Sequence, residues 1–169
     1  HLRLTTNISL NYLMDEQTFV LDEVKYLALT YGPPLEASLS ETSESFLSKT
    51  IEYWRSWVKT ASIVNFYQRE AIRSALILKI HQYEDTGAIV ASTTTSLPES
   101  PGSTRNWDYR YCWPRDASLS AGALVELGSL AEAHALLAWI LERVRQLPGP
   151  EQLRPLYALA GDEFLPEAV

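Results

Sequence analysis

The chain has 169 residues, of which 46% are hydrophobic and 21% charged, a composition that is ordinary for a globular protein. Its 14 basic and 21 acidic residues give a formal net charge of −7, and no basic run occurs. This charge argues against nucleic acid or an anionic membrane surface as a partner. No run of about 18 apolar residues occurs, so no transmembrane helix is expected.

Residues 2–31 are predicted to be β-structure. Three apolar runs, LRLTT, TFVLDEV and KYLALTY, are rich in residues that favour strands, and polar residues separate them. The sequence GPP at 32–34 ends this pattern. Residues 35–45 are predicted to be a polar linker, in which Ser38 and Glu41 form a capping-box pattern for the helix that follows.

Two helices are predicted next. The first has apolar residues at helical spacing from Phe46 to Val58. The second runs from about Tyr67 to Tyr83, and Gly87 is its stop signal. One face of this second helix is expected to carry Ile72, Ala75, Leu76, Lys79, Ile80 and Tyr83.

A helical hairpin is predicted after residue 113. Its first helix has Pro114 at the first position and ends at Gly128, and its interior is so apolar that we expect burial on more than one side. Its second helix starts at Ser129, with Glu132 among the residues placed outside. The inner face is predicted to contain Leu130, His134, Leu137, Ile140, Leu141 and Val144. The short break predicts antiparallel neighbours, as in a layered helical barrel or solenoid, and the lack of an internal repeat favours a closed barrel.

The sequence RNWDYRYCWPRD, residues 105–116, combines two tryptophans and two tyrosines with three arginines and two aspartates. We call it the motif. Aromatic rings can pack on the apolar face of a pyranose, while an Arg fork and a carboxylate bind its hydroxyls through charge-assisted hydrogen bonds. A phosphate site would need Arg without Asp, and no metal-ligand spacing is visible. The motif therefore indicates a neutral, hydroxyl-rich ligand.

Structural roles are the alternative for several residues. Trp107 and Tyr111 could be core residues, and Arg–Asp neighbours often form structural ion pairs. Trp54 and Trp57 are expected to pack between helices, and His81 and His134 to be core or boundary residues. Cys112 is the only cysteine, so no disulfide within the chain can form and a reducing compartment is favoured. We predict a buried, inert thiol, because all three histidines are distant in sequence.

Residues 87–128 closely resemble the glucoamylase-type glycoside hydrolases, family 15, which include glucoamylases, glucodextranases and bacterial-type trehalases. A weaker resemblance extends over 1–169, where LEAS, AIRSALILKI and LRPLYALAGDEFLPE occur in the expected order. It implies a mainly α fold that begins an (α/α)6 barrel of helical hairpins. Residues 1–34 would be the last strands of an N-terminal β-sandwich, 35–45 a linker, and 46–169 the first hairpins of an incomplete barrel.

The resemblance also implies a function. The family releases glucose from non-reducing ends with inversion, and four residues match its innermost glucose subsite: Tyr109, Trp113, Arg115 and Asp116. Its two catalytic glutamates lie on later barrel loops, so we expect no catalytic residue in this chain. We interpret Glu99 and Glu126 as a loop and a helix residue. Pro114 departs from the family, in which Leu or Thr is common, and this bears on the fine positioning of the subsite.

We therefore expect a fragment of an inverting, exo-acting α-glucoside hydrolase, either glucoamylase-like or a trehalase, and the motif favours the group with trehalases. The expected partners are an α-glucoside, a glucan oligosaccharide or trehalose, and the rest of the barrel, with no cofactor. Both ends look cut, and without a signal peptide we expect a cytoplasmic location. The alternative is a non-catalytic helical structural or sugar-binding module derived from the family.

Overall fold

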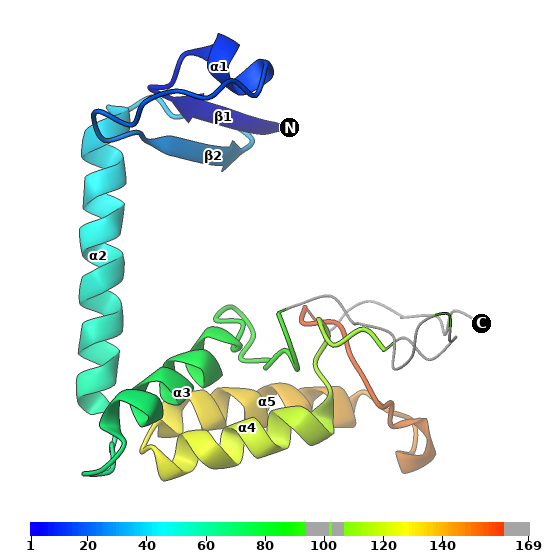
Figure 1. The fold of residues 1–169 in the computed structure, drawn as a ribbon. Coiled ribbons are helices and arrows are strands. Elements are labelled where there is room, and N and C mark those ends of the chain that lie inside the picture. The colour runs from blue at the N-terminus through cyan, green and yellow to red at the C-terminus, as the bar shows by residue number, and fades with distance from the viewer. Residues whose placement is uncertain (94–101, 103–106, 161–169) are drawn as a thin grey trace. The chain divides into compact units, whose positions relative to one another are not determined.

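The computed structural model describes residues 1–93, 102 and 107–160 (Figure 1). These residues are mainly helical with one two-stranded sheet, which confirms the mainly α class. The chain divides into two compact units, His1–Ser56 and Trp57–Val169, which we call the N-terminal and C-terminal units. The β-sandwich, the closed barrel and the boundaries at 34 and 45 stay predictions.

In the N-terminal unit, β1 (Leu2–Thr6) pairs antiparallel with β2 (Leu27–Tyr31), so the first and last predicted strands are confirmed. A short helix that the sequence did not predict, α1 (Leu10–Met14), lies between them. The predicted strand at 18–24 is wrong, because these residues form no strand.

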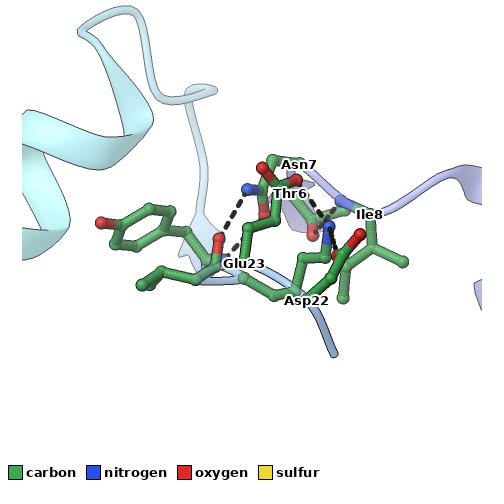
Figure 2. A network of polar contacts seen from close by, with 8 residues as sticks. Thr6, Asn7, Ile8, Asp22 and Glu23 are labelled. Carbon is green, nitrogen blue, oxygen red and sulfur yellow. Dashed lines mark hydrogen bonds and ion pairs between the residues drawn. The ribbon is translucent and has the colours of Figure 1, made fainter. Parts of the chain in front are cut away.

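A side chain takes the place of strand pairing just before β2. Asn7 Oδ1 accepts the backbone N–H of Tyr26 at 2.8 Å, and Asn7 Nδ2 donates to the carbonyl of Val24 at 3.0 Å (Figure 2). In the same cluster, Lys25 forms ion pairs with Asp22 and Glu23. Backbone groups need hydrogen-bond partners, and here an asparagine supplies two of them instead of a neighbouring strand.

The first long helix, α2 (Leu39–Thr60), begins directly after Ser38, whose carbonyl accepts the Thr42 N–H at 3.0 Å. The helix therefore starts at the capping-box pattern, within the range predicted to be a linker and before Phe46. None of the helices in the described ranges is both long and apolar enough to span a membrane.

The C-terminal unit contains α3 (Gln68–Ile80), α4 (Pro114–Glu126) and α5 (Leu130–Arg145), followed by a 3₁₀ turn at Pro150–Gln152. The helices α4 and α5 lie side by side and α3 also contacts α4, so the predicted hairpin is confirmed (Figure 1). Gly128, at φ +78°, follows the C-terminus of α4, where a left-handed residue allows the sharp reversal.

The core of this unit packs small and large apolar side chains together: Ala88, Ile89, Cys112, Ala117, Leu124, Leu136 and Trp139. Gly87 adjoins this core at φ +83°, and a Cβ at that position would lie 2.7 Å from the backbone of Ala135 in α5. Only glycine permits both this backbone conformation and this close approach.

The predicted inner face of α5 is wrong except at Ile140, which packs against the core. Leu130 and Leu137 of α5 are each 52% exposed, whereas Ala133, Leu136 and Trp139 are buried. Apolar residues of α5 lie on more than one side of the helix, so periodicity alone did not identify the face that packs against the core.

The helix α4 is also less enclosed than predicted. Leu119 is 73% exposed, while Ala117 and Leu124 are buried. Within the described residues α4 therefore buries one face, not several.

Candidate functional site

The backbone of the motif is held on one side by the segment that follows Gly87. Ala91 N–H donates to the carbonyl of Tyr111 at 3.0 Å, and Ser92 N–H donates to the carbonyl of Tyr109 at 2.8 Å. The segment AIVAS, residues 88–92, thus pairs with the motif through its last two residues. This pairing fixes the path of the chain through two of its aromatic residues.

Cys112 anchors the other side of the motif. It exchanges two backbone hydrogen bonds of 2.9 Å with Tyr157, and its side chain is fully buried. Burial raises the pKa of the thiol to about 11; the Asp116 charge adds to this rise, and a backbone hydrogen bond from Ile89 opposes it. The thiol is therefore protonated at neutral pH, and the prediction that Cys112 is buried is confirmed.

Two aromatic residues of the predicted subsite lie together. The rings of Tyr109 and Trp113 are 5.4 Å apart between centroids at an angle of 38°, and both side chains are half-buried. The Trp113 indole N–H donates to the carbonyl of Asp108 at 2.9 Å, which fixes the orientation of the ring. Trp107 is 47% exposed, so it is not a core residue.

The two charged residues of the predicted subsite lie in the first turn of α4. Trp113 is the N-cap residue in extended conformation and Pro114 starts the helix, so Arg115 and Asp116 follow directly. Arg115 donates from Nε and Nη2 to Asp116 Oδ2 at 3.1 and 3.0 Å. Both bonds end on one oxygen, so Oδ1 of Asp116 is not used by Arg115. The helix N-terminus favours the negative charge of Asp116.

A second Arg–Asp pair lies within the motif. The carboxylate of Asp108 accepts the Arg110 backbone N–H at 2.9 Å, and the Arg110 guanidinium binds the same carboxylate, at 2.7 Å from Nη2 to Oδ2. Hydrogen bonds from Arg110 lower the pKa of the Asp108 carboxyl, although partial burial opposes this. No role is predicted for Asp108 from the sequence. The spacing Asp-x-Arg was the feature of the sequence that could have indicated this pair across a turn.

The structure thus places the four predicted residues in two contacting pairs that follow each other along the chain. Pro114 joins the aromatic pair, Tyr109 and Trp113, to the charged pair, Arg115 and Asp116. Flat rings beside a cationic fork and a carboxylate can bind a ring with one apolar face and several hydroxyls. No cluster of three or more His, Cys, Asp or Glu side chains that could hold a metal occurs in the ranges that the structure describes.

The remaining candidates have structural surroundings. Trp57 is half-buried, packs against the core and donates its indole N–H to Glu132 at 2.9 Å, so its predicted packing role is confirmed. His81 hydrogen-bonds the carbonyl of Ile77 at 2.6 Å. Glu126 is the exposed last residue of α4, as predicted, and Glu99 lies outside the described residues.

Comparison with known proteins gives the same family as the resemblance seen in the sequence. The family model "Glycosyl hydrolases family 15" matches residues 65–167. The chain is 37% identical to a trehalase of Thermoplasma volcanium over 73% of this chain and 19% of that protein. It is 34% identical to a trehalase of Mycobacterium tuberculosis over 99% of this chain and 25% of that protein. It is 37% identical to trehalase 1 of Sulfolobus acidocaldarius over 84% of this chain and 24% of that protein.

These matches and the helical fold define the class, which is that of the glycoside hydrolases. Within this class, the chain belongs to glycosyl hydrolases family 15, and the resemblance seen in the sequence is confirmed. No solved structure matches the chain at a significant level. The chain spans 19–26% of the length of the curated relatives that it matches.

Proposed function

We propose that this chain is part of an enzyme that hydrolyses trehalose or a related α-glucoside and releases glucose from the non-reducing end with inversion. The observation that carries the proposal is the charged pair, Arg115 and Asp116, placed directly after the aromatic pair in a family 15 chain. Trehalose is our first choice of substrate because the matched relatives are named trehalases.

The proposed role of the chain is to hold the terminal glucose. Tyr109 and Trp113 offer ring faces for the C–H face of the sugar. The Arg115 guanidinium, 70% exposed, donates to hydroxyl oxygens, and the Asp116 carboxylate accepts from hydroxyl groups. Both kinds of contact are charge-assisted and are about twice as strong as neutral hydrogen bonds. Together they would fix the orientation of the sugar at the reacting carbon.

The hydrolysis itself needs two carboxyl groups that the resemblance places beyond Val169. In an inverting reaction one carboxylic acid protonates the leaving oxygen, while a carboxylate removes a proton from the attacking water. The two groups lie roughly 6.5–9.5 Å apart to leave room for that water. We therefore propose that later hairpins of the same barrel supply the acid and the base.

The test uses the full-length polypeptide and this 169-residue chain in parallel. We expect the full-length protein to hydrolyse trehalose and, by NMR in the first minutes, to release one α-glucose and one β-glucose per molecule. The 169-residue chain alone should release no glucose from trehalose or maltose. Two α-glucose molecules would contradict inversion, and preference for maltose would favour a glucoamylase-like enzyme. Absence of glucose from every α-glucoside would favour the non-catalytic module.

A further inference from the structure

Asp108 is the hydrogen-bonding centre of the motif. Its side-chain Oδ1 accepts the backbone N–H of Arg110 at 2.9 Å, and its backbone carbonyl accepts the indole N–H of Trp113 at 2.9 Å. The Arg110 side chain closes on the same carboxylate, with Nε–Oδ1 at 3.0 Å and Nη2–Oδ2 at 2.7 Å. A single residue therefore holds both a backbone turn and the ring of Trp113.

We propose that Asp108 is a positioning residue that sets the orientation of the Tyr109–Trp113 pair toward the glucose. A carboxylate that accepts the N–H two residues on closes an Asx turn, and this turn fixes the peptide groups around it. The carbonyl that holds the Trp113 indole belongs to Asp108 itself. Without the turn, that carbonyl can rotate and the indole loses its fixed acceptor. This inference rests on the proposed function.

The turn needs a side-chain oxygen at position 108 that accepts the Arg110 N–H, and it does not need the negative charge of Asp108. The side chains of Asp108 and Arg110 are 34% and 56% exposed, and exposed ion pairs contribute little. An asparagine has the same acceptor oxygen and favours the same turn. The proposal therefore separates Asp108→Asn, which keeps the turn, from Asp108→Ala, which removes it.

The experiment measures kcat and KM on trehalose in the full-length protein. We expect Asp108→Ala to raise KM about tenfold with a smaller change in kcat, because a misplaced binding surface weakens sugar binding. Asp108→Asn and Arg110→Ala should stay within about twofold of the wild type, since both keep the turn. Asp108→Ser keeps a weaker acceptor and should be intermediate, and it replaces Asp108→Ala if that variant folds poorly.

A double-mutant cycle tests whether Asp108 acts through Trp113. Trp113→Phe keeps a ring but has no N–H, so adding Asp108→Ala to it should change KM by less than about twofold. The proposal is overturned if Asp108→Ala raises KM by the same factor in Trp113→Phe as in the wild type, because the two residues would then act independently. It is also overturned if Asp108→Asn is impaired as strongly as Asp108→Ala, because Asp108 would then act through its charge.

A readout independent of turnover separates this inference from the proposed function. The contribution of the Trp113 indole to the near-ultraviolet circular dichroism is obtained by subtracting the spectrum of Trp113→Phe from that of the wild type. The proposal requires that Asp108→Ala lose this signal and Asp108→Asn keep it; an unchanged signal in Asp108→Ala overturns it. If the wild type cleaves no α-glucoside, the proposed function fails, and the dichroism alone decides whether Asp108 positions Trp113.

Discussion

The two units of the chain use their apolar residues in opposite ways. No residue of the N-terminal unit, all of which is described, is buried, and Leu29 of β2 is 67% exposed. In the C-terminal unit, Ile89, Leu124 and Leu136 are at most 2% exposed. Complete burial of such a side chain is worth about 1.5–3 kcal/mol, so the free energy of folding in the described residues comes mainly from the C-terminal unit.

In the N-terminal unit, polar contacts add to the pairing of β1 with β2 and to ring contacts such as that of Tyr12 with Phe19. A two-stranded sheet is marginally stable on its own, and here Asn7 adds two hydrogen bonds to the residues before β2. The motif lies in the C-terminal unit, where extended segments on both sides and the core below hold its backbone. A binding site needs a rigid support, and among the described residues the buried core of the C-terminal unit offers that support to the proposed site. Matched substitutions in the two units test this difference.

The largest contrast is expected in activity. In the full-length protein, Asp116→Asn should lower kcat/KM on trehalose at least about a hundredfold, because the charge-assisted contacts that orient the sugar are lost. Arg115→Ala should act in the same direction. Both side chains are partly exposed, so the midpoint of thermal unfolding should barely change. Asp15→Asn in the N-terminal unit is the control; wild-type activity in Asp116→Asn would contradict the subsite.

Stability should show the next largest contrast. Leu124 is fully buried, so Leu124→Ala should lower the free energy of unfolding by about 2–5 kcal/mol, through lost burial and a residual cavity. Leu29→Ala removes the same atoms from an exposed site and should change it by less than about 0.5 kcal/mol. Urea unfolding of the full-length variants measures both values. Equal losses would mean that Leu29 is covered by another part of the protein.

Glycine substitutions separate backbone strain from close packing. Gly32 (φ +92°) and Gly87 (φ +83°) both have left-handed backbone, but only Gly87 has a neighbour where a Cβ would be. Gly32→Ala should cost about 1–2 kcal/mol from backbone strain alone. Gly87→Ala should cost about 2–4 kcal/mol, since Ala135 must also move. Urea unfolding of the two variants compares them, and a smaller cost at Gly87 would contradict the close approach.

The features that the sequence predicted correctly are those with local causes. Pro114 and Gly128 mark the two ends of α4 within two residues, because a helix start and a left-handed stop depend on the residue itself. The motif was found because its mixture of rings and charges is uncommon in a loop or a core. Its assignment to a glucose subsite needed the family resemblance and is still a prediction.

The features that the sequence did not predict depend mainly on contacts between residues that are distant along the chain. The buried face of α5 depends on the segments that pack against it, and the close approach of Gly87 to Ala135 is one such contact that no helical period contains. The proposed role of Asp108 depends on its own carbonyl and on a ring five residues later. Glu132 was placed on the outer face of α5, whereas its side chain is 12% exposed and paired with Lys79, which is also 12% exposed.

The pairing of Glu132 predicts a stability that depends on pH. Its carboxylate accepts from Trp57 Nε1 at 2.9 Å and Lys79 Nζ at 3.1 Å. Burial opposes its charge, but the hydrogen bonds from Trp57, the backbone and Lys79 outweigh burial and lower the pKa of Glu132 below its ordinary 4.5. A lowered pKa in the folded state stabilises the protein above the ordinary pKa, and the gain is lost as the pH falls through the folded value.

Replacing Glu132 by glutamine tests this dependence at nearly constant size. At neutral pH, Glu132→Gln should lower the free energy of unfolding by about 1–2 kcal/mol, because hydrogen bonds to a charged acceptor are stronger. The difference from wild type should shrink below pH 4.5, where the wild-type carboxylate loses its charge. The control is Glu44→Gln in the N-terminal unit, where Glu44 accepts from Tyr26 Oη at an exposed site and the change should stay below about 0.5 kcal/mol. Urea unfolding between pH 3 and pH 7, roughly the range in which carboxylates titrate, measures both variants. A difference for Glu132→Gln that stays constant with pH would mean that the charge of Glu132 does not stabilise the fold.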